Sequence, residues 1–515
     1  MLKPYKFWIH PISFGIFPVI YLLAHNVSEI HISASYRALG VSLLTAILLT
    51  VVYKRISKDW HKASLMASLC LVLFFSYGHI YNALLEAEIH SITHGVHRYL
   101  IPLWLLLFAF GARWIIRRSK EILSMTNALN MISIAALMMP IFQIISFEVQ
   151  TFRAETQLLE TDVGTETFQL PEGQQPPDIY YIILDAYARD DSLLADYGLD
   201  NTPFLDSLAD EGFYIAPCSQ SNYNTTHFSL ATSLNMNYVE DLLKPEQMTG
   251  TKRTGLGHLI KHSFVRQTLE NLGYKSIAFE TGFIWTQIED ADIYLSQNQA
   301  ALGGERLSKY VNEFELLLLK SSAALIIIDG TALLPNITPQ DIDKTDNARR
   351  DLVLFVFEQL NSMPSVEGPK FVFAHIVSPH RPFVFAADGS TNINRNKTAA
   401  YAEQVTYINT QILSLVDNLM TNSEIPPIII LQGDHGGVAL KVGSSRLKIL
   451  NAYHLPQGGN EHLYPNISPV NSFRVIFNTY FNGNLPLLED FGFYSTDNAP
   501  FDLIFVPESR PDCQQ

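Results

Sequence analysis

Four short stretches of the sequence carry side chains that could hold a metal ion and move an anionic group. Asp185 ends the apolar run 178–185, and Asp434 and His435 follow a second apolar run, within the segment 433–437. Two carboxylates and one imidazole offer two hard oxygens and one nitrogen, a ligand set that suits Zn²⁺ or Mn²⁺. We therefore predict that these three residues bind a divalent metal ion.

The other two stretches supply hydroxyl groups and cationic side chains. The segment 221–235 (SNYNTTHFSLATSLN) is rich in Ser and Thr and passes into a helix-like pattern. A metal ion beside a hydroxyl lowers its pKa and makes it a nucleophile, and a helix N-terminus favours a bound anion. After the apolar run that contains His375, the residues His380 and Arg381 could steady the anion or protonate a leaving oxygen. The implied reaction is the transfer or hydrolysis of a phosphate or sulfate ester.

Alternating strands and helices would bring these stretches together. Strands are predicted at 178–185, 275–280, 371–377 and 427–432, and helices at 203–211, 265–272 and 399–419. This alternation predicts an α/β sheet with mostly parallel strands covered by helices, in which ligands bind at the carboxyl ends of strands. A lone Asp after a strand is more often a helix cap, and a Ser/Thr cluster is more often a turn. The prediction therefore depends on all four stretches occurring together, three of them at strand ends.

The first 150 residues are apolar and basic, whereas the remainder is acidic. Residues 1–150 carry 12 Lys+Arg and 6 Asp+Glu, the remaining residues carry 23 and 44, and the chain has a net charge of −15. Five apolar stretches approach the ~20 residues that cross a bilayer, and they lie at 7–24, 38–53, 64–85, 99–116 and 130–147. We predict a bundle of five transmembrane helices over 1–150, a linker over 151–177 and a soluble catalytic domain over 178–515.

The charges of the loops predict the orientation in the membrane. The N-terminus and the segments 54–62 and 113–120 are rich in Lys and Arg, whereas 26–37 and 86–98 are poor in them. Positive loops stay cytoplasmic, so five crossings would leave the catalytic domain on the extracytoplasmic or periplasmic side of the cytoplasmic (inner) membrane. The alternative is four spans with a buried fifth helix, which would leave the domain inside.

A sixth apolar run, 316–334, is interrupted by Lys320 and Asp329. A charge at the centre of a bilayer costs several kcal/mol, so we predict a buried helix that runs into a strand rather than another span. A span at this point would also separate the two halves of the proposed active site by the membrane.

These motifs resemble those of the alkaline phosphatase/sulfatase superfamily. GDHGG at 433–437 is similar to its (S/G)DHG metal motif, and LDAYAR at 184–189 is similar to its first metal-binding strand end. The segment 221–235 resembles the nucleophile segment of the membrane-bound branch, in which a Thr is followed three residues later by a Ser. That branch includes lipoteichoic acid synthases and phosphoethanolamine transferases, and its members have five N-terminal spans and an extracytoplasmic catalytic domain. His375 and His380 match the H-x4-H-x-P-(Y/F) segment of the phosphoethanolamine transferases.

The resemblance implies a role for each candidate residue. Asp185, Asp434 and His435 would be metal ligands. Thr226 would be the nucleophile and would also contact the metal ion. His380 would contact the substrate or a second ion.

Two nearby residues are weaker candidates for the nucleophile. Thr225 is the adjacent hydroxyl, and only the spacing to Ser229 selects Thr226 instead. Many sulfatases convert the Cys of a Cys-x-Pro-Ser-Arg motif to formylglycine, but Cys218 lacks that Pro and Arg, so we interpret it as structural. Because Cys70 lies in an apolar run, at most one disulfide is expected outside the membrane.

Together these features predict a membrane-anchored, metal-dependent enzyme that acts on phosphate or sulfate esters through a phospho-threonine. Its location favours a lipid-linked or glycan substrate of the cell envelope, and its acidic domain argues against a nucleic-acid partner. One alternative is a catalytically inactive scaffold that keeps the fold. Another is a transporter with an accessory domain, which the scarcity of ionisable residues inside the spans disfavours. The oligomeric state stays open.

Overall fold

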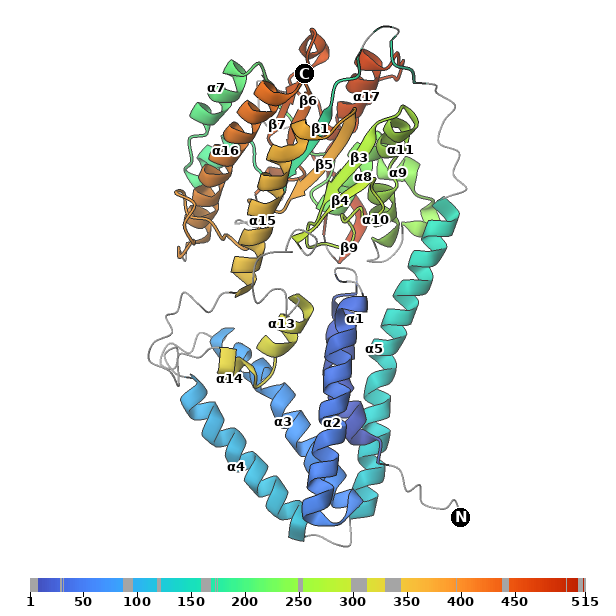
Figure 1. Ribbon diagram of the computed structural model, residues 1–515, viewed down its shortest axis with the longest axis vertical. Coiled ribbons are helices and arrows are strands. Elements are labelled where there is room, and N and C mark those ends of the chain that lie inside the picture. Colours follow the sequence, from blue (N-terminus) through green and yellow to red (C-terminus); the bar gives the residue numbers. More distant parts are fainter. Residues whose placement is uncertain are drawn as a thin grey trace. The chain divides into compact units, whose positions relative to one another are not determined.

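The chain forms two compact units in the computed structural model (Figure 1). The described residues are 8–27, 30, 32–86, 96–117, 122–158, 168–171, 173, 175–248, 253–297, 313–328, 344–394, 396–437, 444–496, 498–507 and 513. One unit, which we call the membrane unit, comprises Met1–Gln150 and Glu305–Thr345. The other, which we call the sheet unit, comprises Thr151–Gly304 and Asp346–Gln515.

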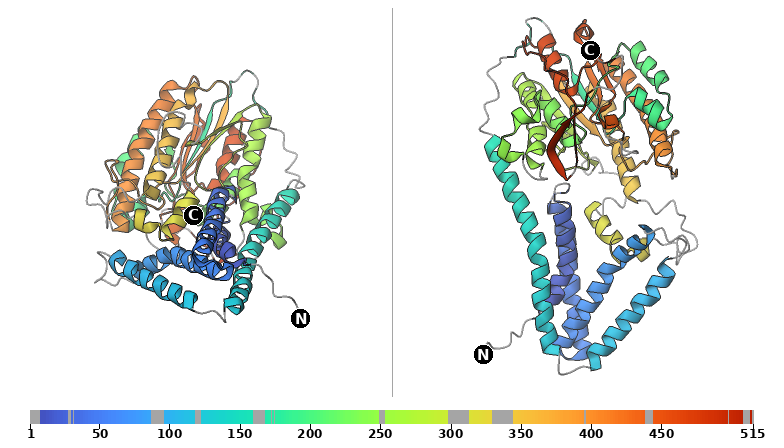
Figure 2. Two further views of the ribbon diagram at one scale, coloured as in Figure 1. Left: turned by 60° about the horizontal axis from the view of Figure 1, so that its bottom comes forward. Right: turned by 180° about the vertical axis from the view of Figure 1, so that it is seen from behind.

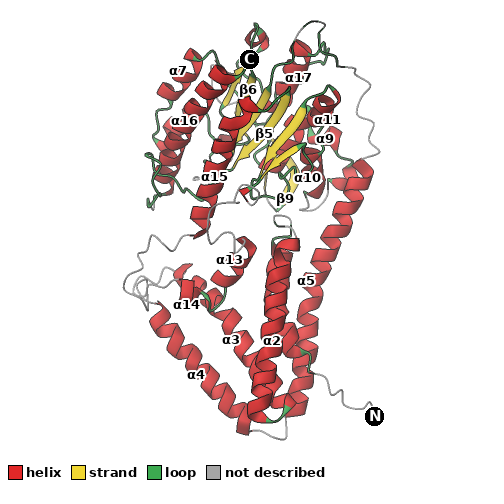
Figure 3. Cartoon of the chain, in the orientation of Figure 1, coloured by secondary structure: helices red, strands yellow, loops and turns green. Residues whose placement is uncertain are grey.

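The membrane unit is built from apolar helices (Figure 3). Its N-terminal part contains α1 (His10–His25), the 3₁₀ turn η1 (Ile32–Ser35), α2 (Tyr36–Ser57), α3 (Trp60–Glu86), α4 (Val96–Arg117) and α5 (Ile122–Leu158). Among the described residues, four stretches are long and apolar enough to cross a membrane: Ile32–Ser57, Trp60–Leu84, Val96–Arg117 and Ile122–Val149. They coincide with four of the five predicted spans. Helix α5 also continues to Leu158, so the first part of the predicted linker is helical.

The first predicted span, 7–24, forms a shorter helix than expected. Helix α1 has 16 residues and is about 24 Å long, against the ~30 Å of a bilayer core. Proline is favoured in the first helical turn, where Pro11 lies, and the helix ends before Asn26. The described part of the chain therefore holds four helices of membrane-spanning length rather than the predicted five.

The apolar run 316–334 differs from its prediction. Its described part lies in two short helices of the membrane unit, α13 (Glu313–Lys320) and α14 (Leu325–Ile328), separated by a turn. The predicted strand is wrong for residues 325–328, which are helical, and residues 329–334 lie outside the described residues. Apolarity alone cannot separate a buried strand from a short buried helix, which explains the error.

The sheet unit contains a seven-stranded sheet with the order β2-β7-β6-β1-β5-β3-β4. Its strands are β1 (Ile179–Leu184), β2 (Tyr214–Ile215), β3 (Lys275–Phe279), β4 (Ile293–Leu295), β5 (Lys370–Ile376), β6 (Ile428–Gly433) and β7 (Asn451–His454). The five strands from β6 to β4 are parallel, and β7 and β2 add antiparallel pairs at one edge. All four predicted strands are present, and the mostly parallel sheet is confirmed. A separate two-stranded sheet joins β8 (Phe493–Thr496) and β9 (Ala499–Phe505).

Helices cover both faces of the large sheet (Figure 2). Alternate residues of β1 explain this arrangement, because Tyr181 and Ile183 belong to one buried apolar cluster and Tyr180 and Ile182 to the other. One face packs against α8 (Thr226–Asn235), α10 (Thr254–Lys261), α11 (Phe264–Asn271) and α17 (Pro469–Tyr480), with the short α9 (Val239–Leu242) nearby. The other face packs against α6 (Asp190–Tyr197), α7 (Thr202–Asp210), α15 (Lys344–Ser362) and α16 (Lys397–Asn422). The remaining short 3₁₀ turns are η2 (Pro245–Gln247), η5 (Met363–Ser365), η6 (Ser444–Leu447) and η7 (Gly459–His462).

Candidate metal centre and nucleophile segment

Three adjacent parallel strands bring the predicted metal-binding residues to one edge of the sheet. Strand β1 pairs with β5 on one side and with β6 on the other, and Leu184 is in register with both Ile376 and Gly433. The next residues along β1 and β6 are Asp185 and Asp434. Their side chains therefore emerge next to each other at the carboxyl ends of the strands, where ligands bind in parallel sheets.

The structure brings Asp185, Asp434 and His435 together and adds His375 to them. One ligand atom from each of Asp185, His375 and Asp434 lies within 4.8 Å of the others. The His375 Nε2 atom is 3.4 Å from Asp185 Oδ2. The His435 Nε2 atom is 3.7 Å from Asp185 Oδ1 and 3.6 Å from Asp434 Oδ2. All four residues are buried.

Several polar atoms of this cluster are buried without a hydrogen-bond partner. They are Asp185 Oδ1, His375 Nε2 and Asp434 Oδ2. Buried polar atoms are almost always paired, so three orphans that face one another fit an ion that would bind them. His435 Nδ1 lies 2.9 Å from the Gly436 carbonyl oxygen, which can only accept a hydrogen bond. The Nδ1–H therefore donates, so Nε2 carries the lone pair, which can accept from a donor or bind a metal ion.

The electrostatics of the cluster favour the protonation states that bind a metal. Burial alone would raise the pKa of Asp185, but the nearby imidazoles of His380 and His375 outweigh burial and hold that pKa below its usual range. Burial lowers the pKa of His435. An ionised carboxylate and a neutral imidazole at pH 7 are the forms that act as metal ligands.

The backbone after Asp185 holds the carboxylates of Asp185 and Asp434 close together. Ala186 has φ of 65°, in the left-handed region that non-glycine residues rarely adopt. In that conformation its N–H donates to Asp434 Oδ1 at 2.9 Å, and its carbonyl accepts from the Tyr401 hydroxyl at 2.7 Å. Gly433 is needed because a Cβ at this position would collide with the Tyr187 carbonyl oxygen. The turn after β1 and the end of β6 therefore fit only with glycine at 433.

The hydroxyl-rich segment lies against the metal-binding residues. Ser221 Oγ is 2.5 Å from the Asp434 carbonyl oxygen and 3.1 Å from Ser229 Oγ, so it joins the start of the segment to the end of β6. Thr225 is the N-cap residue of α8, and its buried Oγ1 has no hydrogen-bond partner. Thr226 is the first residue of α8 and is half-buried. The predicted nucleophile therefore occupies a helix N-terminus, where backbone N–H groups attract an anion.

His380 lies beside the cluster, as the sequence predicts for a substrate-binding residue. Its ring centroid is 6.3 Å from that of His435, and its Nδ1 is 2.9 Å from the Arg381 carbonyl oxygen. Gln404 of α16 donates to the His380 carbonyl at 3.1 Å and fixes this loop. The side chain is partly exposed, so it could meet a substrate that enters from solvent.

Sequence reasoning missed two members of the site. His375 was noted only as part of a motif, because it lies inside an apolar strand rather than after it. Arg446 carries no motif, yet its Nη2 atom lies 3.4 Å from His435 Nε2. A guanidinium at this distance would favour an anionic substrate group. The role of all these residues as ligands or catalysts stays a prediction.

An aromatic wall adjoins the cluster. The His227 ring stacks on Trp285 with centroids 3.7 Å apart, and Trp285 lies 6.1 Å from His375. Burial, together with the nearby charges of Arg253 and His375, lowers the pKa of His227 to about 3. His227 is therefore neutral at pH 7, and the wall next to Thr226 is aromatic rather than cationic.

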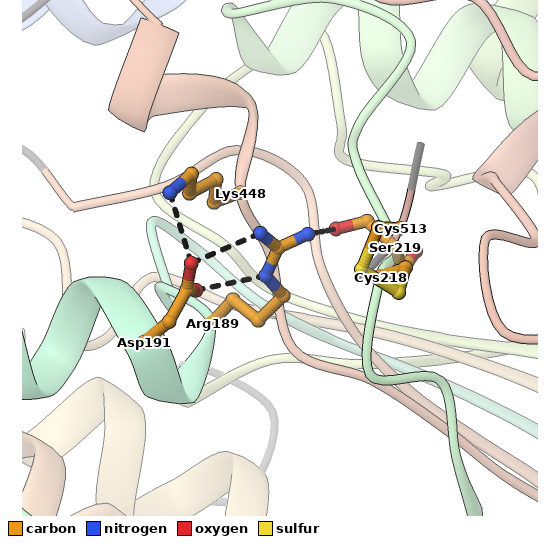
Figure 4. Close-up of a disulfide and its surroundings, with 6 residues drawn as sticks. All are labelled: Arg189, Asp191, Cys218, Ser219, Lys448 and Cys513. Carbon is orange, nitrogen blue, oxygen red and sulfur yellow. Dashed lines mark hydrogen bonds and ion pairs between the residues drawn. A yellow bond between two sulfur atoms is a disulfide. The ribbon is translucent and has the colours of Figure 1, made fainter. Parts of the chain in front are cut away.

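A disulfide and an ionic network brace the loops around the site (Figure 4). Cys218 and Cys513 form a disulfide, and Cys70 is the free cysteine among the described residues. Arg189 pairs with Asp191 at 2.8 Å, and Lys448 pairs with the same carboxylate at 2.9 Å. The Arg189 Nη1 atom also donates to the Ser219 carbonyl at 3.0 Å, next to the disulfide. The segments that follow β1, precede α8 and precede β7 are thereby tied together.

Comparisons with known proteins bear on the sheet unit. A family model described as Sulfatase matches residues 177–475. No curated protein sequence matches the chain. The chain resembles the C-terminal periplasmic domain of EcEptC from Escherichia coli in complex with Zn, with 12% identity, a TM-score of 0.41, and coverage of 66% of this chain and 95% of that chain. It also resembles lipooligosaccharide phosphoethanolamine transferase A from Neisseria meningitidis, with 12% identity, a TM-score of 0.40, and coverage of 91% and 95%.

Proposed function

Because the chain belongs to the sulfatase family, we propose that it is a membrane-anchored, metal-dependent enzyme that transfers or hydrolyses phosphate or sulfate esters. The observation that carries this proposal is the buried set of unpaired ligand atoms on Asp185, His375 and Asp434. A structural cluster would have its buried polar atoms hydrogen-bonded, whereas these three atoms lack hydrogen-bond partners.

The four residues of the cluster would hold the cation, with His435 contributing Nε2. When bound, a divalent cation polarises the ester and lowers the pKa of a neighbouring hydroxyl. These four residues offer oxygen and nitrogen ligands, which suit Zn²⁺ or Mn²⁺. Loss of any one ligand would leave the others buried and unpaired.

We propose Thr226 as the nucleophile of a two-step reaction. Its hydroxyl would lose its proton to solvent and its oxygen would form a bond to phosphorus. The bond to the leaving oxygen would break, and His380 would give that oxygen a proton. Water or an acceptor alcohol would then release the group from Thr226. The disulfide between Cys218 and Cys513 supports this choice, because a disulfide-bonded sulfur cannot act as the nucleophile.

The substrate class follows from charge and location. Arg446 and His380 lie beside the cluster and suit an anionic group, and the chain carries helices of membrane-spanning length. A phosphorylated head group of an envelope lipid, or a lipid-linked glycan, would meet both conditions. We propose this class as the substrate.

An assay of the full-length protein in detergent tests the reaction class. We expect the metal-stripped protein to be inactive, and added Mn²⁺ or Zn²⁺ to restore turnover of at least one aryl phosphate, phosphodiester or sulfate ester. The matched control is Asp434→Ala, which should stay inactive with either metal. Equal background rates for all of these samples on every ester would contradict an enzyme and favour an inactive scaffold.

We further propose that the sheet unit lies outside the cytoplasm, in the periplasm or its equivalent. The disulfide supports this side because disulfides persist in oxidising compartments. The basic segments 54–62 and 113–120 support it because positive loops stay cytoplasmic. Helices α2 to α5 are enough for this orientation, and α1 decides only on which side the N-terminus lies.

Labelling of intact cells with a membrane-impermeant maleimide tests the orientation. In a Cys70→Ser background, Leu194→Cys on the exposed side of α6 should be labelled without permeabilisation. Ile56→Cys, at the exposed C-terminal end of α2, should be labelled only after permeabilisation. The reverse pattern would put the sheet unit in the cytoplasm.

A further inference from the structure

A short segment lies between two parts of the sheet unit in the sequence but belongs to the membrane unit. The described residues on either side of this segment are Gln297 and Lys344. Between them, α13 and α14 pack with the N-terminal helices. We call residues 313–328 the inserted segment. Its contacts and its neighbours define a site that the proposed reaction does not use.

Specific contacts fix the inserted segment to the membrane helices. The guanidinium of Arg37, at the start of α2, pairs through two nitrogens with the Glu315 carboxylate, and one of these bonds measures 2.6 Å. The Ala323 N–H donates to the Phe74 carbonyl of α3 at 2.7 Å. Gly78 permits the close approach, because a Cβ there would collide with the backbone of residues 320–322. These contacts indicate that the inserted segment packs specifically against the membrane helices.

The inserted segment forms one side of an open pocket of about 220 Å³, which we call the cavity. Its walls come from α3, α4 and the inserted segment, and they include Cys70, Tyr77, Trp104, Leu105, Ala323 and Ile326. The polar atoms of its aromatic residues are engaged elsewhere. The Trp104 indole N–H donates to the Leu73 carbonyl at 2.8 Å, and the Tyr77 hydroxyl lies 2.7 Å from His97 Nδ1. The surface that faces the cavity is therefore apolar.

The cavity is continuous with the surface that would face lipid. Leu105 lines it and is 63% exposed, and Phe74 lines it and is 39% exposed. Both residues lie in helices long and apolar enough to cross a membrane, so hydrocarbon is the medium expected at the cavity mouth. An ordered water needs two to four polar partners, which this lining does not offer. A cavity of about 150 Å³ is already large enough to bind benzene, so this one can hold part of a hydrocarbon chain.

We propose that this cavity binds an acyl chain of a membrane lipid, with the inserted segment as one wall. The occupant follows from the apolar lining, the volume and the hydrocarbon medium at the mouth. The site is independent of the metal centre and of the chemistry proposed for it.

Photolabelling of the full-length protein tests the site. The wild type is reconstituted in nanodiscs whose phosphatidylcholine carries a diazirine on one acyl chain, illuminated, and mapped by peptide mass spectrometry. We expect labels on cavity residues such as Cys70 and Ala323 in excess over exposed residues of helices that line the cavity, such as Leu106 on α4 and Ile327 on α14. Equal labelling of both groups, or labels on the exposed group alone, would overturn the proposal.

Two filling variants provide an independent measurement. Ala323→Phe adds bulk from the inserted segment and Cys70→Phe adds bulk from α3, and each should lose the label on the remaining cavity residues. Ile327→Phe is the matched control, because the same new side chain lies on α14 at a position that is 83% exposed, and it should keep the wild-type label pattern. Unchanged cavity labelling in both filling variants would also overturn the proposal.

Discussion

Thr226→Ala is expected to lower kcat/KM on every substrate that the wild type turns over by about 10³-fold or more, since removal of a nucleophile eliminates the covalent route. Thr226 is half-buried at the start of α8, so loss of its hydroxyl should change stability little. Metal content should stay near that of the wild type if the carboxylates and imidazoles supply most of the binding energy. The measurement is steady-state turnover together with metal analysis of the same samples.

Thr225→Ala is the matched control for this prediction. It has the same side chain one residue earlier, and its Oγ1 is buried without a hydrogen-bond partner and makes no capping bond to α8. We expect it to keep most of the activity. If Thr225→Ala is inactive and Thr226→Ala is active, the nucleophile is Thr225 and the spacing to Ser229 misled the assignment.

The covalent intermediate gives a second readout for Thr226. Rapid acid quenching during turnover of a phosphate ester should trap protein that is heavier by one phosphoryl group. Peptide mapping should assign that group to Thr226, and Thr226→Ala should show none. A phosphoryl group found on a different residue of the segment 221–235 would reassign the nucleophile without changing the reaction class.

The strands and the polar residues that follow them could be predicted because they obey local rules. The apolar runs that form β1, β5 and β6 are buried on both faces, and such runs are typical of central parallel strands. Polar residues that follow such strands gather at one edge, which is why Asp185 and Asp434 were identified together. The sequence could predict this proximity without any knowledge of the helices that cover the sheet.

His375 shows what the sequence could not specify. It lies within β5 among apolar residues, so its type suggested a core histidine as readily as a ligand. Its approach to Asp185 depends on register: Ile183 pairs with His375, and only this alignment brings Nε2 within 3.4 Å of the carboxylate. Register between strands nearly 200 residues apart is a tertiary property that no local pattern encodes.

The inserted segment was misjudged for a related reason. Its apolar residues indicate burial but not the partner that buries them. Arg37 and Glu315 are 278 residues apart, and their pairing selects the membrane helices as the partner. The predicted length of α1 is a smaller error of the same kind. Apolarity predicted a helix but not the residues at which it begins and ends.

Asp434→Asn is expected to reduce metal affinity by more than about 100-fold, the upper range for loss of an outer partner of a metal ligand. The change removes the charge that a cation needs but keeps an oxygen at the same position. The Ala186 N–H can still donate to that oxygen, so the turn after β1 should survive. Metal stoichiometry after dialysis against a weak chelator measures the effect.

Thermal unfolding separates this loss from a loss of folding. A metal ion that binds only the folded protein stabilises it by about 2.7 kcal/mol at a concentration of 100 Kd. Added Zn²⁺ or Mn²⁺ should therefore raise the Tm of the wild type and of Asp206→Asn, an exposed control on α7, but not that of Asp434→Asn. Without metal, Asp434→Asn should be at least as stable as the wild type, because a buried carboxylate with an unpaired oxygen destabilises the folded state. A wild type that gains nothing from either metal would remove the physical basis of the proposed reaction, since Asp185 and Asp434 would then be buried together without a cation between them.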